Sequence, residues 1–247
     1  MARIVFITGA TSGIGFATAE LMLEKGYSVW AVGRREDRLR ELQEKFPKSC
    51  VTGFMDVTDT ESVDDFFSKH HPAQIDILIN NAGLAVGTEK AFEAPFEDWN
   101  QMLQTNVTGL LYVSSKVLPH LARKPGSHVV NLGSVAGKWV YPGGAVYCAT
   151  KSAVRAFSEG LRMDLMGRKV KVTNIEPGMV ETEFSLVRLK NQDLADRVYA
   201  GMEPLRAQDI AESILWCLER PAHVNVSELT LFPVDQAGVG PHLVARS

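Results

Sequence analysis

The chain has 247 residues, of which 45% are hydrophobic and 22% charged, and its formal net charge is −3. This length and composition suit one soluble domain with a large apolar core and exclude an intrinsically disordered chain. A net charge so close to zero gives no electrostatic basis for binding nucleic acid or an anionic membrane.

Targeting and metal-binding signals are missing from the sequence. No apolar run approaches the roughly 18 residues of a membrane span, and a candidate strand begins almost at the first residue, which leaves no room for a signal peptide. We therefore expect a cytoplasmic protein. The cysteines (Cys50, Cys148, Cys217) and the six histidines show no metal-ligand spacing, so we expect free thiols and no metal.

The first element is a short apolar run from Arg3 to Ile7, as a buried parallel strand requires. It leads into Thr8-Gly9-Ala10-Thr11-Ser12-Gly13-Ile14-Gly15, whose glycines allow a tight turn and a close approach to a pyrophosphate. A helix predicted over 16–25 would point free N–H groups at the phosphates. The spacing is G-x-x-x-G-x-G, which departs from G-x-G-x-x-G, and a flexible strand-to-helix turn is the alternative interpretation.

The second predicted strand, 28–32, is followed by Arg34 and Arg35 and by no carboxylate at its end. A carboxylate there would bind the ribose 2′-hydroxyl of NAD and repel a 2′-phosphate. Two guanidiniums instead offer charge-assisted donors to phosphate, so the site favours NADP, with Arg34 the stronger candidate. The alternative is that both arginines are solvated residues opening the next helix.

The remaining strands and helices alternate along the chain. Strands are predicted at 51–55, 75–80, 128–132, 170–175 and 227–232, and helices at 35–46, 61–70, 97–123, 145–168 and 207–219. This alternation predicts an α/β fold: a single doubly wound Rossmann domain over 1–247, with a seven-stranded parallel sheet and helices on both faces.

Two segments interrupt the alternation. Residues 178–205 contain no predicted strand and mix apolar with charged residues, which suggests a mobile lid over a substrate. Residues 233–247 look extended, and they are interpreted either as a frayed tail or as a segment docked on a neighbouring subunit.

Tyr147 and Lys151 are spaced to share one face of a helix, about 6 Å apart along its axis. A phenol has a pKa near 10, so acid–base work near neutrality needs a shift of roughly three units, about 4 kcal/mol, and a neighbouring cation is the obvious source. Ser134 and Asn106 lie upstream, and the four residues together suggest a proton-transfer site for hydride chemistry. For the Tyr-Lys pair alone, the alternative is an ordinary pair of helix-surface neighbours.

With these elements placed, the chain resembles the short-chain dehydrogenase/reductase family over nearly its whole length. The matching motifs are Thr8-Gly9-x-x-x-Gly13-x-Gly15, Asp56-Val57, Asn80-Asn81-Ala82-Gly83, Asn106, Ser134, Tyr147-x-x-x-Lys151 and Pro177-Gly178.

The resemblance implies a catalytic set of Tyr147, Lys151, Ser134 and Asn106. Tyr147 would exchange a proton with the reacting oxygen while hydride moves to or from the nicotinamide. Lys151 would lower the pKa of Tyr147 and bind the nicotinamide ribose, and Ser134 would hydrogen-bond the reacting oxygen. Asn106 would hold a water that links Lys151 to solvent, although an asparagine inside a long helix is more often a local packing residue.

The resemblance also implies a set of residues that bind NADP(H), with Asp56 accepting from the adenine amine and Thr182 meeting the nicotinamide carboxamide. The set is Gly9, Thr11, Ser12, Gly13, Ile14, Gly15, Arg34, Arg35, Asp56, Val57, Asn80, Ala82, Gly83, Tyr147, Lys151, Pro177, Gly178, Val180 and Thr182.

For the substrate, several stretches resemble the NADP-dependent 3-hydroxy acid dehydrogenase (serine 3-dehydrogenase) branch, including 80–87 and 182–188. Such enzymes oxidise L-serine, L-allo-threonine or 3-hydroxyisobutyrate, or reduce semialdehydes such as malonic semialdehyde. A small anionic substrate needs a cation, and Arg188 is the candidate, beside Ser134 and Tyr147; a solvated lid face is the alternative.

Two other functions remain open. Sulfoacetaldehyde reductase, or another small aldehyde or ketone reductase, fits the same arginine, and a non-catalytic NADP-sensing protein is the remote alternative. The resemblance also implies a homotetramer built on the helices at 97–123 and 145–168, and hydrophobic residues such as Leu110, Leu111, Val113, Val117 and Leu118 exceed one narrow stripe.

Overall fold

The computed structural model describes residues 2–240 and 244–245. Its sheet contains seven parallel strands in the order β3-β2-β1-β4-β5-β6-β9, which confirms the predicted doubly wound fold. The strands are β1 (Ile4–Thr8), β2 (Ser28–Gly33), β3 (Cys50–Phe54), β4 (Ile77–Asn80), β5 (His128–Leu132), β6 (Lys171–Pro177) and β9 (Glu228–Leu231).

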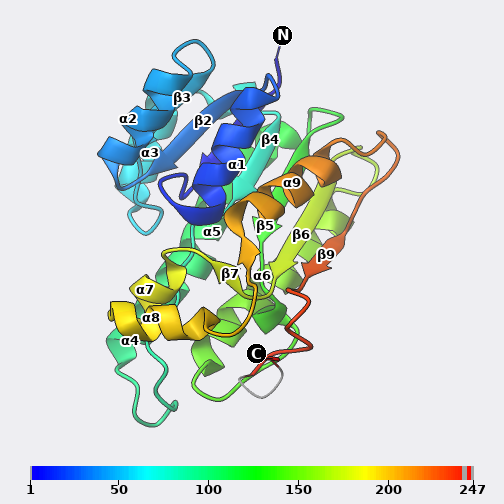
Figure 1. Ribbon diagram of the computed structural model, residues 1–247. Helices are drawn as coiled ribbons and strands as arrows, with labels where there is room; N and C mark the ends of the chain where they lie inside the picture. Colours follow the sequence, from blue (N-terminus) through cyan, green and yellow to red (C-terminus); the bar gives the residue numbers. More distant parts are fainter. Residues whose placement is uncertain (1, 241–243, 246–247) are drawn as a thin grey trace.

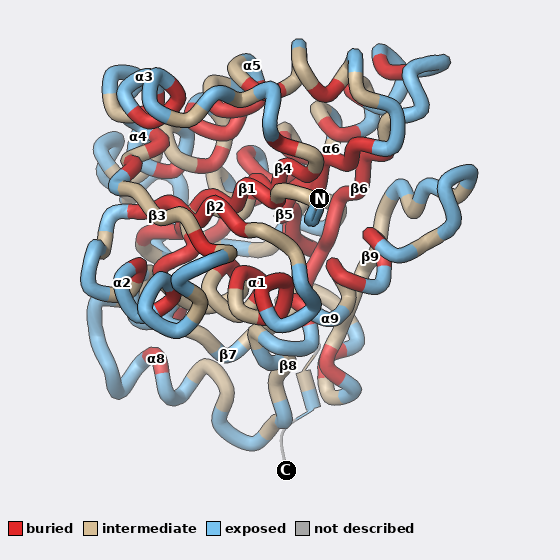
Figure 2. Tube along the Cα trace, turned by 90° about the horizontal axis from the view of Figure 1, so that it is seen from above, coloured by how far each residue is buried: buried red, intermediate tan, exposed pale blue. Residues whose placement is uncertain are grey.

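Helices cover both faces of this sheet (Figure 1). One face carries α1 (Gly13–Glu24), α2 (Glu36–Lys45) and α9 (Ala207–Leu218), and the other carries α3 (Thr60–Lys69), α4 (Phe96–Leu103), α5 (Leu110–Leu121) and α6 (Ala145–Asp164). Figure 2 shows the buried strands between these two layers. Because both faces are covered, the strands are nearly continuous apolar runs.

A row of buried amides crosses the centre of the sheet. Asn80 pairs in register with Asn131, and Asn131 pairs with Asn174. Asn80 Nδ2 donates to Asn131 Oδ1 (2.9 Å) and to Ser114 Oγ of α5 (3.0 Å), while Asn131 Nδ2 donates to Ser158 Oγ of α6 (2.8 Å). The row therefore ties the central strands to the two helices beside the site.

The single helix predicted over 97–123 is wrong in its middle. Residues Gln104–Gly109 form a π turn, η2, between α4 and α5. A side chain on Gly109 would have its Cβ 2.7 Å from the carbonyl oxygen of Val57, so the glycine permits a close approach there. The wider turn places Asn106 inward, and such turns are frequent at functional sites.

The segment predicted as a lid is more regular than expected. It contains α7 (Phe184–Leu189) and α8 (Gln192–Tyr199), and its first residues form a short strand, β7 (Val180–Glu181), paired with β8 (Leu205–Arg206). The prediction of no strand was therefore wrong, because two residues are too few to produce a hydrophobic pattern. Figure 1 shows α7 and α8 beyond the carboxyl ends of the strands.

The described part of the tail folds back onto the same chain. Gln236 Oε1 accepts a hydrogen bond from the backbone of Met179 (2.8 Å), and Asp235 Oδ2 accepts one from Glu203 (2.8 Å). Gln236 also bridges to Val244. Residues 241–243 and 246–247 of the predicted tail lie outside the described residues.

Candidate active site

The glycine loop follows β1 and turns directly into α1. A side chain on Gly9 would have its Cβ 2.9 Å from Ala82 Cα, and one on Gly15 would lie 2.4 Å from the Gly9 carbonyl oxygen. Gly9 also has φ +66°, a left-handed conformation that favours glycine. Both positions therefore require glycine. Nothing larger fits between the loop and the end of β4.

Asn81, for which we predicted no separate role, braces this loop. Its Nδ2 donates to the carbonyls of Thr8 (2.9 Å) and Gly9 (3.1 Å), and Thr8 Oγ1 accepts from the backbone of Asn81 and Ala82. The side chain of Ser12 makes no capping bond within the described chain. The N–H groups at the start of α1 can therefore serve a phosphate.

A cleft of about 410 Å³ runs along the carboxyl ends of the strands, within the roughly 300–1,000 Å³ usual for ligand sites. Of the residues predicted to bind the cofactor, it is lined by Gly9, Thr11, Ser12, Gly13, Ile14, Arg34, Arg35, Asp56, Val57, Ala82, Gly83, Tyr147, Lys151, Pro177, Gly178, Val180 and Thr182. Gly15 is not among the residues that line the cleft, because it packs against Gly9 and Asn81. Asn80 points its buried side chain into the amide row, so a direct contact with the cofactor through that side chain is not supported.

Arg34 and Arg35 occupy different environments at the end of β2. The side chain of Arg34 is 62% exposed, with Nη1 3.8 Å from Asp56 Oδ2. Arg35 donates to the Thr11 carbonyl (2.8 Å) and to Glu183 Oε2 (2.8 Å). Both guanidiniums line the cleft and could hold an anionic group of a cofactor.

Tyr147, Lys151 and Ser134 converge at the inner end of this cleft. Tyr147 and Lys151 come from one face of α6, with Lys151 Nζ 5.9 Å from the centre of the Tyr147 ring. Lys151 Nζ donates to the carbonyl of Leu132 at the end of β5 (2.7 Å), and Ser134 Oγ accepts from the Ala136 N–H (3.1 Å) and lines the same end of the cleft. A phenol, a hydroxyl and an ammonium thus surround one small volume.

The direction of the Tyr147 pKa differs from our expectation. Burial raises the pKa of Tyr147 above its usual value, and the hydrogen bond from Ser134 and the charge of Arg188 oppose that rise. Burial lowers the pKa of Lys151 to about 8. Desolvation disfavours both charged forms here, so the predicted lowering of the Tyr147 pKa by Lys151 does not occur in this structure.

Both polar atoms of the Asn106 side chain are hydrogen-bonded to other parts of the protein. Its Nδ2 donates to the Leu84 carbonyl (2.8 Å) and to Thr150 Oγ1 (3.0 Å), and its Oδ1 accepts from the Leu84 backbone N–H (2.8 Å). The side chain therefore fastens the π turn to the loop that follows β4. Its predicted role in holding a water stays a prediction.

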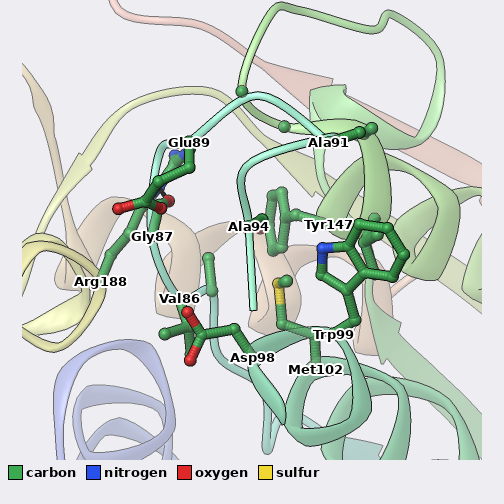
Figure 3. A pocket seen from close by; sticks show the side chains of 15 residues that line it. Val86, Gly87, Glu89, Ala91, Ala94, Asp98, Trp99, Met102, Tyr147 and Arg188 are labelled. Carbon is green, nitrogen blue, oxygen red and sulfur yellow. Dashed lines mark hydrogen bonds between the residues drawn. The ribbon is translucent and has the colours of Figure 1, made fainter. Parts of the chain in front are cut away.

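Arg188 lines the same small cavity as Tyr147. It lines a second, small cavity of about 20 Å³, and Tyr147 lines both this cavity and the cleft. Figure 3 shows Arg188 and Glu89 on one side of this cavity, with Tyr147, Trp99 and Met102 across from them. The candidate substrate cation and the candidate proton donor thus share one enclosure.

The beginning of the lid segment touches three parts of the site. The Thr182 methyl lies 3.2 Å from where a Cβ on Gly13 would be, Glu183 pairs with Arg35, and the Phe184 ring lies 5.8 Å from the Tyr147 ring. Thr182 Oγ1 accepts from the Phe184 backbone (3.2 Å). Three consecutive residues therefore connect the glycine loop, Arg35 and Tyr147.

The fold and this set of side chains define a dinucleotide-dependent dehydrogenase. A family model described as short chain dehydrogenase matches residues 3–193, and the chain belongs to that family.

The chain is similar to curated proteins over nearly its whole length. It is 45% identical to serine 3-dehydrogenase of Rhizobium radiobacter over 97% of both chains. It is 44% identical to NADP-dependent 3-hydroxy acid dehydrogenase YdfG of Salmonella typhi over 96% of this chain and 97% of that protein. A solved structure, the closed form of serine dehydrogenase complexed with NADP+, superimposes with a TM-score of 0.92 at 42% identity, covering 99% of this chain and all (100%) of that one.

Two kinds of feature are absent from the described residues. No helix within residues 2–240 is long and apolar enough to cross a membrane. In the same part of the chain, no group of three or more histidine, cysteine, aspartate or glutamate side chains is arranged to hold a metal ion.

Proposed function

We propose that the protein transfers hydride between NADP(H) and a small 3-hydroxy acid or its semialdehyde. Candidate substrates are L-serine, L-allo-threonine, 3-hydroxyisobutyrate and malonic semialdehyde. The observation that carries the substrate class is Arg188 beside Tyr147 in one enclosure. The names of the relatives, serine 3-dehydrogenase and NADP-dependent 3-hydroxy acid dehydrogenase, support the same class.

The chemistry follows from the three polar groups at the inner end of the cleft. NADP(H), when bound, accepts or supplies the hydride. The Tyr147 phenol takes the proton from the alcohol in oxidation and returns it to the carbonyl oxygen in reduction. The Ser134 hydroxyl holds the reacting oxygen within reach of that phenol. Lys151, which lines the cleft beside Tyr147, binds the nicotinamide ribose in this proposal.

The cofactor assignment rests on the end of β2. Arg34 and Arg35 line the cleft there, and guanidinium is suited to a 2′-phosphate because it presents planar, charged donors. The glycine loop accommodates a pyrophosphate because only glycine fits at Gly9 and Gly15. We therefore propose NADP(H) as the cofactor.

Arg188 gives the site its preference for an anion. Guanidinium binds carboxylate through two parallel hydrogen bonds, which also fixes the orientation of a small substrate. A substrate anchored in this way presents its hydroxyl carbon to the cleft that Tyr147 also lines. The lid segment 178–205 carries Arg188, so occupancy and lid position are coupled in this proposal.

The test is NADP reduction by the purified protein with L-serine and 3-hydroxyisobutyrate, beside isethionate and 2-methyl-1-propanol. We expect the hydroxy acids to give the highest kcat/KM, and Arg188→Gln to remove that advantage. Preference for the neutral alcohol contradicts the proposal. Arg123→Gln, beyond the end of α5, is a matched control that retains the preference.

Two other outcomes identify the alternatives. Preference for isethionate indicates a sulfoacetaldehyde reductase, because a sulfonate satisfies the same arginine. Undetectable turnover across small alcohols and carbonyls, together with tight NADPH binding, indicates a non-catalytic NADP sensor.

We further propose a cytoplasmic homotetramer in which α4, α5 and α6 pack against symmetry mates. Of the hydrophobic residues on α5, Leu110, Val113 and Val117 are buried within the chain, whereas Leu111 is 41% exposed. Phe96 of α4 and Met163 of α6 are also exposed, at 66% and 58%. Large apolar side chains in such positions favour contact with another subunit. Light scattering that gives the mass of a monomer at micromolar concentration contradicts the assembly.

A further inference from the structure

Tyr141 lies in the turn that precedes α6 and is held there by close packing. A Cβ on Gly144 would lie 2.4 Å from the Tyr141 ring, and a Cβ on Gly143, which has φ +74°, would lie 2.2 Å from the Thr88 carbonyl oxygen. The turn is thus pressed against its own tyrosine and against the loop that follows β4. The ring has little freedom to move.

The same ring supports the guanidinium of Arg188. Arg188 Nη1 donates to the Tyr141 hydroxyl (3.2 Å), and the guanidinium carbon lies 5.5 Å from the ring centre. Arg188 Nε donates to the Gly87 carbonyl (3.1 Å), while the Gly87 N–H donates to the Arg188 carbonyl (3.1 Å). A long, flexible side chain is therefore held in one orientation before any substrate arrives.

The hydrogen bonding leaves the Tyr141 proton available. Guanidinium has no acceptor, so the Tyr141 oxygen must be the acceptor in its bond with Arg188. The O–H of Tyr141 then remains as a neutral donor adjacent to a cation. Two donors of this kind, side by side, match the two oxygens of a carboxylate.

Carboxylates line the same cavity as Arg188, so an anionic substrate needs hydrogen-bond donors that are already oriented toward it. The cavity that Arg188 lines also contains the carboxylates of Glu89 and Asp98. Glu89 Oε2 accepts from the Thr88 N–H (2.8 Å), and backbone hydrogen bonds hold the pKa of Glu89 below its usual value. Because this negative charge repels an anionic substrate, the attraction must come from a guanidinium aimed at the substrate and from a neutral partner.

Arg188 also connects Tyr141 to the cavity that Tyr147 lines. The pKa of Tyr147 responds to Tyr141 and Arg188 in opposite directions, Tyr141 raising it and Arg188 lowering it. The geometric link is Arg188, which donates to the Tyr141 hydroxyl and lines the small cavity together with Tyr147. A small acid held by Tyr141 and Arg188 would be near the phenol that exchanges its proton.

We propose that Tyr141 is the second carboxylate ligand of the substrate site and a determinant of its preference for acids over neutral alcohols. The proposal rests on the proposed function, because it deepens the role given to Arg188. In it, the Tyr141 hydroxyl both orients Arg188 and donates its own proton to one carboxylate oxygen.

The experiment measures kcat and KM of wild type and Tyr141→Phe with 3-hydroxyisobutyrate and with 2-methyl-1-propanol, which lacks the carboxylate. Phenylalanine keeps the ring that packs on Gly144. We expect the ratio of kcat/KM for the acid to that for the alcohol to fall about 10- to 100-fold, as loss of a hydrogen bond to a charged group predicts. The fall should appear mainly in KM for the acid, because Tyr147 is untouched.

Three further arms separate the outcomes. Tyr112→Phe, which removes a hydroxyl bonded to Asp64 on the far side of α5, should retain the ratio. Arg188→Gln combined with Tyr141→Phe should cost less than the sum of the two single changes, since the two groups act together. Tyr141→Leu also lacks the hydroxyl and replaces the first variant if that one fails to fold, with the same expected ratio.

Two results overturn different claims. If wild type shows no preference for the acid, the proposed substrate class is wrong. If wild type prefers the acid and Tyr141→Phe or Tyr141→Leu keeps that preference, the substrate class stands and the role of Tyr141 is wrong. A loss of kcat with both substrates and no change in the ratio also contradicts the role, because it indicates disturbance of Tyr147 alone.

Discussion

Arg35 and Glu183 form an ion pair of 2.8 Å that joins the end of β2 to the first turn of the lid segment. The two residues are separated by most of the chain, and Arg35 is also bonded to the Thr11 carbonyl of the glycine loop. The pair therefore closes one side of the cleft. A dinucleotide that enters or leaves on that side must displace the pair.

Glu183→Gln should accelerate NADPH dissociation by about 1.5- to 5-fold, because a partly exposed pair contributes only a fraction of a kilocalorie to about 1 kcal/mol. Stopped-flow displacement of NADPH measures this rate. The difference from wild type should shrink at about 1 M salt, where screening weakens the pair. Equal rates at low salt would show that the pair does not restrain the lid. Glu181→Gln, for which no ion pair is described, is the matched control.

Arg34→Ala should lower the ratio of kcat/KM for NADP to that for NAD by about 10- to 100-fold, as expected for loss of a charge-assisted contact to phosphate. Steady-state kinetics with both cofactors measure the ratio. Arg38→Ala is the control, because Arg38 pairs with Glu41 on α2. A selectivity ratio that persists in Arg34→Ala removes this residue from the phosphate site and leaves Arg35 as the candidate.

Lys151 should make folding stability depend on pH in alkaline solution. Its pKa is about 8 in the folded protein against 10.5 as the ordinary value, so the unfolded chain binds more protons between these limits and stability rises with pH there. Lys151→Met should remove that rise, and at pH 7 the gain from losing a buried ammonium is partly offset because the Leu132 carbonyl loses its donor. Urea unfolding of both proteins from pH 7 to pH 10 tests this.

The comparison with Lys151→Met matters because other groups titrate in the same range. Burial raises the pKa of Cys50 and Cys217 to about 11, which lowers stability as pH rises through about 9 to 11. These contributions are common to both proteins and cancel in the difference. A pH-independent difference in stability contradicts the assignment to Lys151.

Glu176→Gln should destabilise the protein by about 1 to 3 kcal/mol, because it removes the buried charge that Lys138 faces, while Glu228 still lies 2.9 Å from Lys138. Glu176 is fully buried and accepts from Asn174 (2.9 Å) and Thr230 (2.8 Å), and Lys138 Nζ lies 2.6 Å away. Chemical denaturation measures the loss. Adding Lys138→Met should restore part of it, since both charges are then absent. No recovery in the double variant would assign the loss to the hydrogen bonds instead.

The sequence predicted the sheet because its strands are apolar runs bounded by glycine or charged residues, and it predicted the Tyr147–Lys151 pair because helical spacing is local. The π turn at Gln104–Gly109 was not predictable from local spacing, since the contacts it makes, Asn106 with the backbone of Leu84 and Gly109 with Val57, are with residues distant in sequence. Arg188 was identified as a cation, but its partner Tyr141 lies 47 positions away, and no pattern in one sequence connects such residues.

The predicted direction of the Tyr147 pKa shift was wrong for a different reason. The sequence shows that a lysine is near a tyrosine, but the extent to which both are removed from water is a property of the packed site. Burial is the largest influence on each of their pKa values. Spacing alone therefore favoured the attraction between the two groups and underrated the cost of desolvating both.

The row of amides across β4, β5 and β6 also favours one register of these strands when the sheet assembles. Side chains alternate along a strand, so a slip of one residue in β5 would turn Asn131 toward the apolar layer of α1 and α9 and bring Val130 against Asn80 and Ser158. A mispaired β5 would thus break the bonds of Asn131 to Asn80 and Ser158 and bury its amide without these partners. Variants that replace apolar strand residues with one another should keep the native alignment, whereas Asn131→Val makes neighbouring registers closer in energy.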